Sequence, residues 1–171
     1  MTVLITYASR YGSTAGIAER IAESLTLAGV RTEMRPVDEV EDVSRYSAVV
    51  LGSAVYFGSW LKAAQAFVDE NKRLLSDRPV WLFSSGPLPG AVAPDGQDND
   101  PTPKGVGDLA EQIQARDHQV FDGSLDPGRL NVRDRLIRAL PAGRPLLPEV
   151  DGRDWSAITS WAGGIARALG N

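Results

Sequence analysis

The sequence contains no cysteine and only one histidine, and these scarcities exclude several classes of chemistry. Without cysteine the chain has no disulfides, thiolate nucleophiles, iron–sulfur clusters or cysteine zinc sites, and this composition is typical of the reducing cytoplasm. With His118 as the single histidine, a histidine-rich metal site is excluded as well. We therefore predict a cytoplasmic protein with no resident metal ion.

Long apolar runs and a strong net charge are also missing. No run approaches the roughly 18–20 residues of a membrane span, and the N-terminus lacks the basic-then-apolar order of a signal peptide. The net charge of −4 is mild and of the wrong sign for a protein that binds nucleic acid. The 171 residues have ordinary globular composition, so we predict one folded domain, 1–171.

Short apolar runs alternate with longer amphipathic stretches, which is the pattern of parallel strands joined by helices. The predicted strands are Thr2–Tyr7, Arg31–Val37, Ala48–Gly52, Val80–Ser84 and His118–Phe121. The predicted helices are Thr14–Ala28, Trp60–Leu75 with Ser59 as its cap, Asp108–Ala115 and a last helix capped by Asp154, with at most a poor helix over Glu39–Tyr46. Five strands alternating with helices predict an α/β fold with one open, doubly wound sheet.

Two stretches interrupt this alternation. Gly86–Lys104 is a long predicted loop, dense in glycine, proline and aspartate, and loops of that length are usually functional or disordered. An extra segment, Asp122–Asp151, precedes the last helix and carries a candidate helix at Leu130–Leu140. Four basic residues, Arg129, Arg133, Arg135 and Arg138, are interleaved there with leucine and isoleucine. This pattern indicates contact with an anionic membrane or an acidic partner, or else a solvated helix face over an extended sheet edge.

The turn after the first predicted strand is the most informative part of the sequence. Ser9, Ser13 and Thr14 place three hydroxyls in a turn that opens a helix. Gly12 lets the backbone bend around an anion, and Arg10 adds the only full positive charge of the turn. Because helix N-termini carry unpaired N–H groups and partial positive charge, this turn predicts a phosphate site. The alternative is that Ser13 and Thr14 merely cap the helix.

Competing motifs are absent, since the sequence has neither GxxxxGK[ST] nor GxGxxG after a strand. An acidic cluster at the strand ends, which a receiver-type domain needs for Mg²⁺, is missing too. The string TYASRYGST over residues 6–14 instead closely resembles the phosphate loop of flavodoxins, roughly [ST]-x-x-G-x-T after the first strand. The string LGSAVYFG over residues 51–58 resembles the second flavin loop of the menaquinone-dependent protoporphyrinogen oxidase branch, which also carries extra sequence before its last helix.

This resemblance implies a flavodoxin-like three-layer sandwich, with a five-stranded parallel sheet of order 2-1-3-4-5 and helices on both faces. It implies non-covalently bound FMN used for redox chemistry, and FMN rather than FAD because the turn closes on a terminal phosphate. The implied cofactor-binding residues follow the first, third and fourth strands. They are Ser9, Arg10, Tyr11, Gly12, Ser13, Thr14, Ser53, Ala54, Val55, Tyr56, Phe57, Gly58, Ser84, Ser85 and Gly86.

Two functions then stay open, a two-electron oxidoreductase and a one-electron carrier. Carrier flavodoxins typically stack an aromatic side chain on each flavin face and surround the flavin with carboxylates. Here the second flavin loop, which follows the third predicted strand, offers the aromatic residues Tyr56, Phe57 and Trp60, unless the last two are packing residues. The third flavin loop, Ser84–Leu88 after the fourth predicted strand, offers none. Neither loop has a carboxylate before Asp95. These features favour the enzyme, and a flavin-free binding domain is a third alternative.

The chemistry of such an enzyme would be centred on the flavin, without a catalytic side chain. His118 is predicted at the strand end opposite the ligand edge, so it is not assigned a catalytic role. The resemblance implies a redox partner or a quinone as acceptor. Because a quinone resides in the bilayer, the arginine-rich segment would then favour a peripheral location at the inner face of the membrane.

Overall fold

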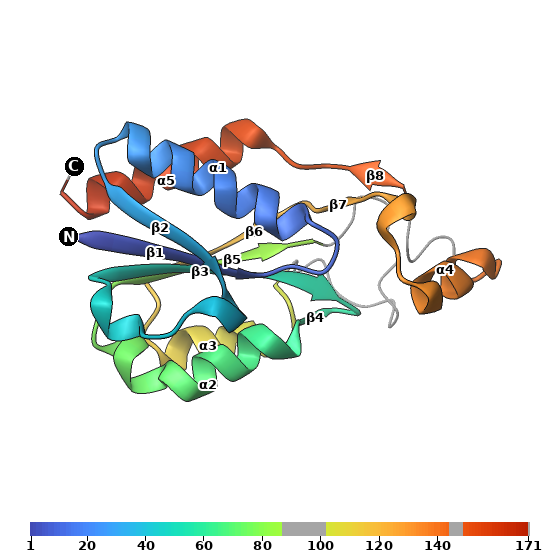
Figure 1. The fold of residues 1–171 in the computed structure, drawn as a ribbon, viewed down its shortest axis with the longest axis horizontal. Helices are drawn as coiled ribbons and strands as arrows, with labels where there is room; N and C mark the ends of the chain where they lie inside the picture. The colour runs from blue at the N-terminus through green and yellow to red at the C-terminus, as the bar shows by residue number, and fades with distance from the viewer. Residues whose placement is uncertain (87–101, 144–148, 171) are drawn as a thin grey trace.

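Five parallel strands form the centre of the computed structural model, which describes residues 1–86, 102–143 and 149–170 (Figure 1). These strands are β1 (Thr2–Ala8), β2 (Arg31–Pro36), β3 (Ala48–Tyr56), β5 (Val80–Ser85) and β6 (Asp117–Phe121). They lie in the order β2-β1-β3-β5-β6, which confirms the predicted order 2-1-3-4-5. Their near-continuous apolar runs are explained by burial on both faces, and every residue of β5 is buried.

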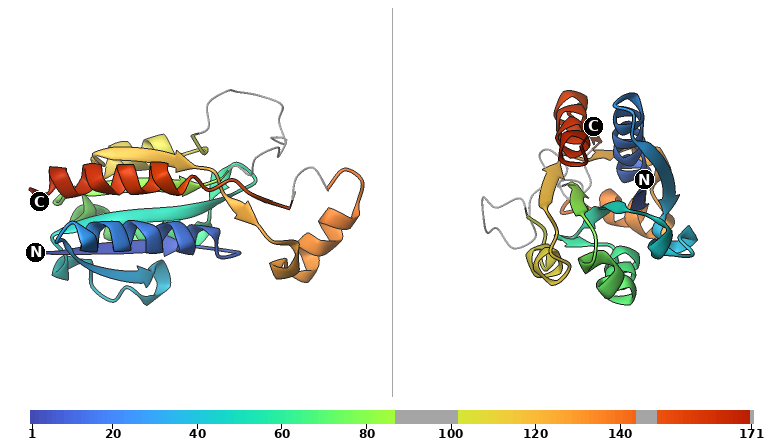
Figure 2. Two further views of the ribbon diagram at one scale, coloured as in Figure 1. Left: turned by 90° about the horizontal axis from the view of Figure 1, so that it is seen from above. Right: turned by 90° about the vertical axis from the view of Figure 1, so that its left-hand side faces the viewer.

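Helices cover both faces of the sheet, as the α/β prediction requires (Figure 2). One face carries α1 (Ser13–Leu27) and α5 (Trp155–Ala168), and the other carries α2 (Lys62–Ser76) and α3 (Val106–Gln112). The first core contains Ile17, Ile21 and Leu25 of α1 with Ile158 and Ile165 of α5. The second contains Phe67, Val68 and Leu75 of α2 with Val106 and Ile113. The protein is thus a three-layer α/β sandwich.

The prediction that Ser59 caps a helix starting at Trp60 is wrong. Ser59–Trp60 form a short strand, β4, which pairs antiparallel with the end of β3. The turn between them consists of Phe57 and Gly58, whose φ angles of 50° and 78° are both positive, as a type I′ hairpin turn requires. The helix α2 therefore begins only at Lys62.

The strand β3 also extends further than predicted, because it continues past Gly52 to Tyr56. Most of the predicted second loop is therefore strand. The weak helix expected over Glu39–Tyr46 is replaced by two 3₁₀ turns, Val37–Glu39 and Val43–Arg45. Of the predicted loop Gly86–Lys104, residues 87–101 lie outside the described residues.

The described residues of the extra segment after β6 contain four short elements. These are β7 (Ser124–Leu125), a 3₁₀ turn (Pro127–Arg129), α4 (Val132–Ala139) and β8 (Val150–Asp151). The strands β7 and β8 pair antiparallel, and α4 stands beyond the carboxyl edge of the main sheet (Figures 1 and 2). The candidate helix at Leu130–Leu140 is thus present in shorter form, with the side chain of Asn131 as its N-cap. We call this segment, residues 122–151, the insertion; residues 144–148 lie outside the described residues.

We predict that Gly52→Ala destabilises the fold, because a Cβ at this position would lie 2.0 Å from Cζ of Phe83 in β5. Overpacking a buried site of this kind costs typically about 1–3 kcal/mol. Urea unfolding followed by circular dichroism measures the change. The matched control is Gly107→Ala in α3, where no atom of the described residues lies within 4 Å of the new Cβ and alanine should stabilise the helix. Equal stability of the Gly52→Ala protein and the wild type would contradict this packing.

Candidate cofactor-binding site

The carboxyl ends of β1, β3 and β5 meet at one edge of the sheet. The strand β1 connects to β2 on one side, while β3 lies on its other side, so the strand order reverses between β1 and β3. The pairing of Ala8 with Ser53, and of Ala54 with Ser85, brings the three strand ends side by side. The structure therefore places the three predicted cofactor segments together at a topological switch point, where ligands of doubly wound sheets bind.

The turn after β1 presents the N-terminus of α1 to this edge. The helix begins at Ser13, and its N-cap is Gly12, whose φ of 90° lies in the left-handed region. No side chain caps the helix, so the interpretation of Ser13 and Thr14 as simple capping residues is wrong. The hydroxyl of Ser9 instead accepts a hydrogen bond from the backbone N–H of Gly12 at 3.1 Å, which closes the turn.

Thr14 provides the observation that points to a ligand. Its side chain is fully buried, yet its Oγ1 has no hydrogen-bond partner among the described residues. A buried hydroxyl without a partner costs roughly 1–3 kcal/mol. Because Oγ1 belongs to the first turn of α1, a phosphate oxygen at this N-terminus would satisfy it. The residues of the turn thus fit the phosphate of FMN.

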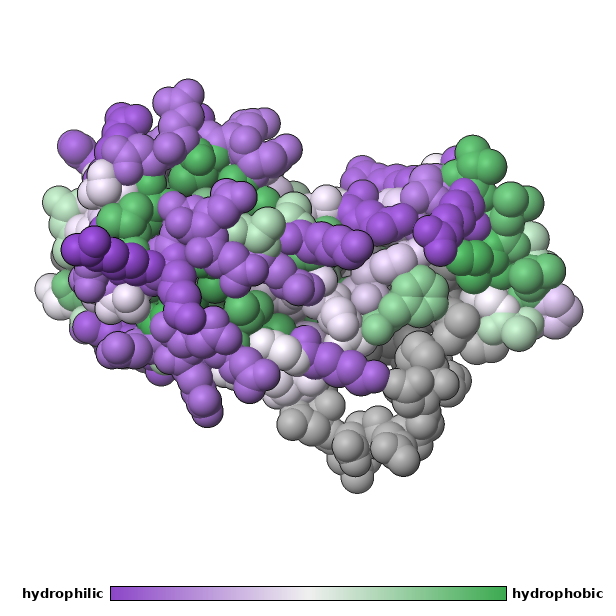
Figure 3. Space-filling view, turned by 90° about the horizontal axis from the view of Figure 1, so that it is seen from below, coloured by the Kyte–Doolittle hydropathy of each residue, from purple (hydrophilic) through white to green (hydrophobic). Residues whose placement is uncertain are grey.

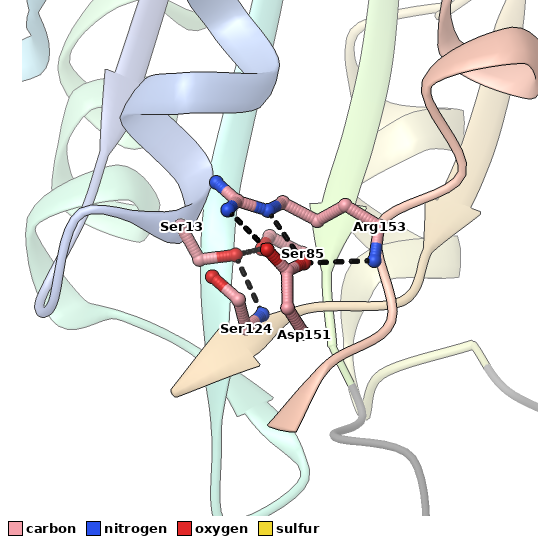
Figure 4. Close-up of polar contacts among 5 residues, drawn as sticks. All are labelled: Ser13, Ser85, Ser124, Asp151 and Arg153. Atoms are coloured by element: carbon pink, nitrogen blue, oxygen red, sulfur yellow. Dashed lines mark hydrogen bonds and ion pairs between the residues drawn. The ribbon is translucent and has the colours of Figure 1, made fainter. Parts of the chain in front are cut away.

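Ser13 has a different role from Thr14, because its hydroxyl already has partners (Figure 4). Its Oγ lies 3.0 Å from Oγ of Ser85 and accepts a hydrogen bond from the backbone N–H of Ser124 at 2.9 Å. One hydroxyl therefore joins α1 to the end of β5 and to the insertion. Beside it, Arg153 binds Asp151 in a bidentate ion pair, with nitrogen–oxygen distances of 2.9 and 2.6 Å.

Ser53 and Ser84 are buried on the α2 side of the sheet, away from this cluster. The Ser53 Oγ accepts a hydrogen bond from the backbone N–H of Leu61 at 3.0 Å. The Ser84 Oγ accepts one from Nε1 of Trp60 at 2.7 Å and lies 2.8 Å from Nε2 of His118. Trp60 is only 3% exposed and is therefore a packing residue that supports β4. Within the part of the chain that the structure describes, no side-chain hydrogen bond joins Ser53 or Ser84 to the phosphate turn.

The remaining predicted residues lie at the open edge. Phe57 is 46% exposed, and its ring centroid lies 4.5 Å from that of Tyr56. Gly86 has a φ of 115°, its N–H donates to the carbonyl of Phe121, and a Cβ there would lie 3.4 Å from Cβ of Val55. Ala54 is partly buried and pairs with Ser85. These positions lie at the edge of the sheet where β3 and β5 end.

Asp134 of α4 is the functional candidate that sequence reasoning missed. Its carboxylate is fully buried, although it belongs to the insertion, and it accepts hydrogen bonds from the phenols of Tyr11 and Tyr56. Nη2 of Arg10 lies 3.3 Å from the same carboxylate, and the Arg10 guanidinium stacks 4.2 Å from the ring centroid of Tyr56. Asp134 thereby joins the first and second cofactor loops to the insertion.

The charges of this cluster are fixed at neutral pH. Burial raises the pKa of Asp134, but the hydrogen bonds from Tyr11 and Tyr56 and the charge of Arg10 outweigh it, so this pKa lies below its ordinary value. Burial, followed by the hydrogen bond to Asp134, raises the pKa of Tyr56 to about 12. Asp134 is therefore ionised and Tyr56 protonated, and the stability that the carboxylate contributes is lost as the pH falls through its lowered pKa.

Arg10 has a charge partner in the structure. The sequence assigned it as the cation for a phosphate, but in the structure its charge is paired with Asp134. Within residues 1–86, 102–143 and 149–170 no group of histidine, aspartate and glutamate side chains could hold a metal ion. In the same part of the chain no helix is both long and apolar enough to cross a membrane.

A three-layer sandwich with an anion-binding turn at its switch point defines a flavodoxin-like protein. A family model described as "Flavodoxin domain" matches residues 4–141, and the chain belongs to this family. Its cofactor is accordingly FMN, which fits the unpartnered Thr14 hydroxyl. The turn after β1 and the carboxyl ends of β3 and β5 are the segments that the sequence assigned to that cofactor.

Solved structures support the fold. The chain is 14% identical to a flavodoxin from the domain Archaea, with a TM-score of 0.64 and full coverage of both chains. It is 14% identical to oxidised flavodoxin 1 from Bacillus cereus, with a TM-score of 0.65 and 98% of each chain covered. Rubredoxin oxygen:oxidoreductase from Desulfovibrio gigas matches over 98% of this chain but only 36% of its own, at 17% identity and a TM-score of 0.63.

A curated relative gives a more specific likeness over a shorter stretch. Protoporphyrinogen IX dehydrogenase (quinone) of Escherichia coli strain K12 is 29% identical over 86 residues. This stretch is 49% of the present chain and 48% of the relative. The match thus spans about half the length of each protein.

We predict that Thr14→Val weakens FMN binding, because it removes the hydroxyl that a phosphate oxygen would satisfy. Hydrogen bonds to a charged group contribute roughly 1.5–3 kcal/mol, which corresponds to a tenfold or greater rise in the dissociation constant. Quenching of FMN fluorescence measures this constant.

The matched control is Thr6→Val in β1. Thr6 is also fully buried with an unpartnered hydroxyl, but it lies two residues before the end of its strand. This variant should bind FMN like the wild type, and neither variant should lose stability without the cofactor. Equal FMN affinity of the Thr14→Val and Thr6→Val proteins would remove Thr14 from the site.

Proposed function

We propose that this protein is an FMN-dependent oxidoreductase that passes two electrons from an organic substrate to a quinone-type acceptor. The observation that carries the proposal is the one-sided distribution of aromatic residues at the site. Tyr11, Tyr56 and Phe57 belong to the first two loops, whereas the sequence from residue 84 to residue 105 contains no aromatic residue. A flavin bound here would keep one face without an aromatic cover, and a substrate could reach that face.

The balance of charge at the site supports the same proposal. The buried carboxylate of Asp134 is paired with Arg10, so it adds little net negative charge next to the cofactor loops. A unit charge at about 4 Å is worth roughly 4 kcal/mol at an effective dielectric of 20, and an unbalanced one would oppose the second, anionic reduction step of a flavin. With the charge balanced, the two reduction steps lie closer together, which suits two-electron chemistry.

The name of the Escherichia coli relative supports the choice of substrate and acceptor. That protein is a protoporphyrinogen IX dehydrogenase that uses a quinone, and the present chain resembles it over about half of its length. We propose a reduced tetrapyrrole of that kind as the substrate class. The alternative function is a one-electron carrier without its own substrate, which the full-length likeness to flavodoxins favours.

Stepwise anaerobic reduction of the FMN-loaded protein tests the choice between these functions. We expect fully reduced flavin to form with little one-electron-reduced flavin, and we expect reoxidation by a soluble quinone. In Arg10→Gln the charge of Asp134 loses its partner, so the fraction of one-electron-reduced flavin should rise. The exposed pair partner Arg20 provides the control Arg20→Gln, which should leave the fraction unchanged. A large one-electron-reduced fraction in the wild type, without quinone or protoporphyrinogen turnover, would establish the carrier instead.

A quinone acceptor also suggests where the protein works, and we propose that α4 rests on the anionic inner face of a membrane. Val132, Leu136 and Leu140 are 75%, 66% and 61% exposed, and their spacing of four residues places them on one side of the helix. They form the apolar patch at one end of the molecule (Figure 3). Arg133 and Arg135 are exposed on the same short helix, so apolar and cationic groups are offered together, as anionic lipid surfaces require.

Sedimentation with lipid vesicles tests this contact. We expect the protein to bind vesicles rich in phosphatidylglycerol at low salt and to bind pure phosphatidylcholine vesicles much more weakly. Leu136→Asp should reduce the bound fraction several-fold. The matched control is Leu27→Asp at the end of α1, where the leucine is 89% exposed but lies outside the insertion. Unchanged binding of the Leu136→Asp protein, or no binding by the wild type, would exclude the contact.

A further inference from the structure

Arg129 of the insertion lies directly against the phosphate turn. A Cβ placed on Gly12 would be only 2.6 Å from Nη1 of Arg129, so the guanidinium occupies the space beside this glycine. Arg129 ends the 3₁₀ turn Pro127–Arg129, whose position is set by a hydrogen bond from the N–H of Gly128 to the carboxylate of Asp126. A cation from a distant part of the sequence thus reaches the N-terminus of α1.

The charge of Arg129 is not consumed by an ion pair within the part of the chain that the structure describes. The pairs found there join Arg10 to Asp134, Arg20 to Glu23, Arg35 to Glu33 and Arg153 to Asp151. The turn's own arginine, Arg10, is therefore paired with Asp134, while Arg129, which lies beside Gly12, takes part in none of these ion pairs. The insertion therefore supplies, through Arg129, a positive charge beside the turn.

The cavity beside Arg129 is lined by groups of both charges. A cavity of about 610 Å³ is lined by Tyr11, Gly12, Ser124, Arg129 and Arg153, and also by the acidic residues Asp126, Glu149 and Asp151. Since Asp151 is paired with Arg153, the cavity as a whole is not positively charged. An anion is favoured where Arg129 meets the N-terminus of the fifteen-residue helix α1. The buried, unpartnered Oγ1 of Thr14 lies in the first turn of that same helix.

We propose that Arg129 is the counter-charge of the FMN phosphate, so that the insertion supplies a full cation to the phosphate site. The guanidinium would approach the phosphate from the insertion, while Thr14 and the first N–H groups of α1 approach it from the helix. Because the same residue belongs to the insertion, the binding of FMN also holds the Pro127–Arg129 turn against the sandwich. Cofactor affinity and the position of the insertion are then thermodynamically linked. The inference rests on the cofactor and not on the proposed substrate.

Titration of Arg129 variants with FMN and with riboflavin, which lacks the phosphate, tests the proposal. Arg129→Gln should raise the dissociation constant of FMN by roughly tenfold to a hundredfold, the range expected for a charge-assisted hydrogen bond. It should leave the dissociation constant of riboflavin unchanged, and it should weaken the salt dependence of FMN binding. Arg129→Lys keeps the charge and should recover part of the affinity.

Arg133→Gln is the matched control, because Arg133 is an exposed arginine of α4 that does not line the cavity. It should bind FMN like the wild type. Hydrogen exchange gives a second readout: FMN should slow exchange over residues 124–143 in the wild type and in Arg133→Gln, but not in Arg129→Gln. Wild-type FMN affinity in Arg129→Gln, or an equal loss of FMN and riboflavin binding, would overturn the proposal.

Discussion

The geometry of the cofactor site depends on one buried carboxylate. Asp134 is fully buried and accepts hydrogen bonds from Tyr11 and Tyr56 while it pairs with Arg10, so its desolvation is offset by three donors at once. Arg10 and Tyr11 belong to the turn after β1 and Tyr56 is the last residue of β3, whereas the acceptor belongs to α4. The other contacts of the insertion with the sandwich include the hydrogen bond of Ser124 to Ser13, the packing of Leu125 and Leu130 on Tyr11 and Tyr56, and the approach of Arg129 to Gly12.

This contact makes the insertion part of the cofactor site. It is not an independent appendage on a flavodoxin-like sandwich, since it neutralises the arginine of the phosphate turn and places Arg129 beside Gly12. The residues that distinguish this chain from a plain sandwich therefore contact the strand ends where the order of the sheet reverses. Differences in function within such a fold arise from sites of this kind and not from the sheet itself.

Local patterns predict the elements well: continuous apolar runs indicate the buried strands, and Gly12 followed by Ser13 and Thr14 indicates the start of α1. The order of the strands does not follow from such patterns and comes from the resemblance to flavodoxins, which the structure confirms. Asp134 could not be predicted, since it stands three residues after the cap Asn131 and has the form of an ordinary first-turn acid. Its partner Tyr11 lies 123 positions away. The hairpin at Phe57 and Gly58 was missed because phenylalanine seldom adopts a positive φ and Ser59 has the form of a helix cap.

The packing of α1 against α5 determines when part of the hydrophobic core can form during synthesis of the chain. Ile17 and Ile21, near the start of the chain, share a core with Ile158 and Ile165, near its end. Because α5 follows α1 far along the chain, the apolar face of α1 is covered only after α5 has been synthesised, and Tyr11 meets the carboxylate of Asp134 only after the insertion has been synthesised. A chain synthesised only as far as β6 already carries the phosphate turn, but it lacks α5 and Asp134, so the apolar face of α1 is uncovered and Tyr11 is without its acceptor.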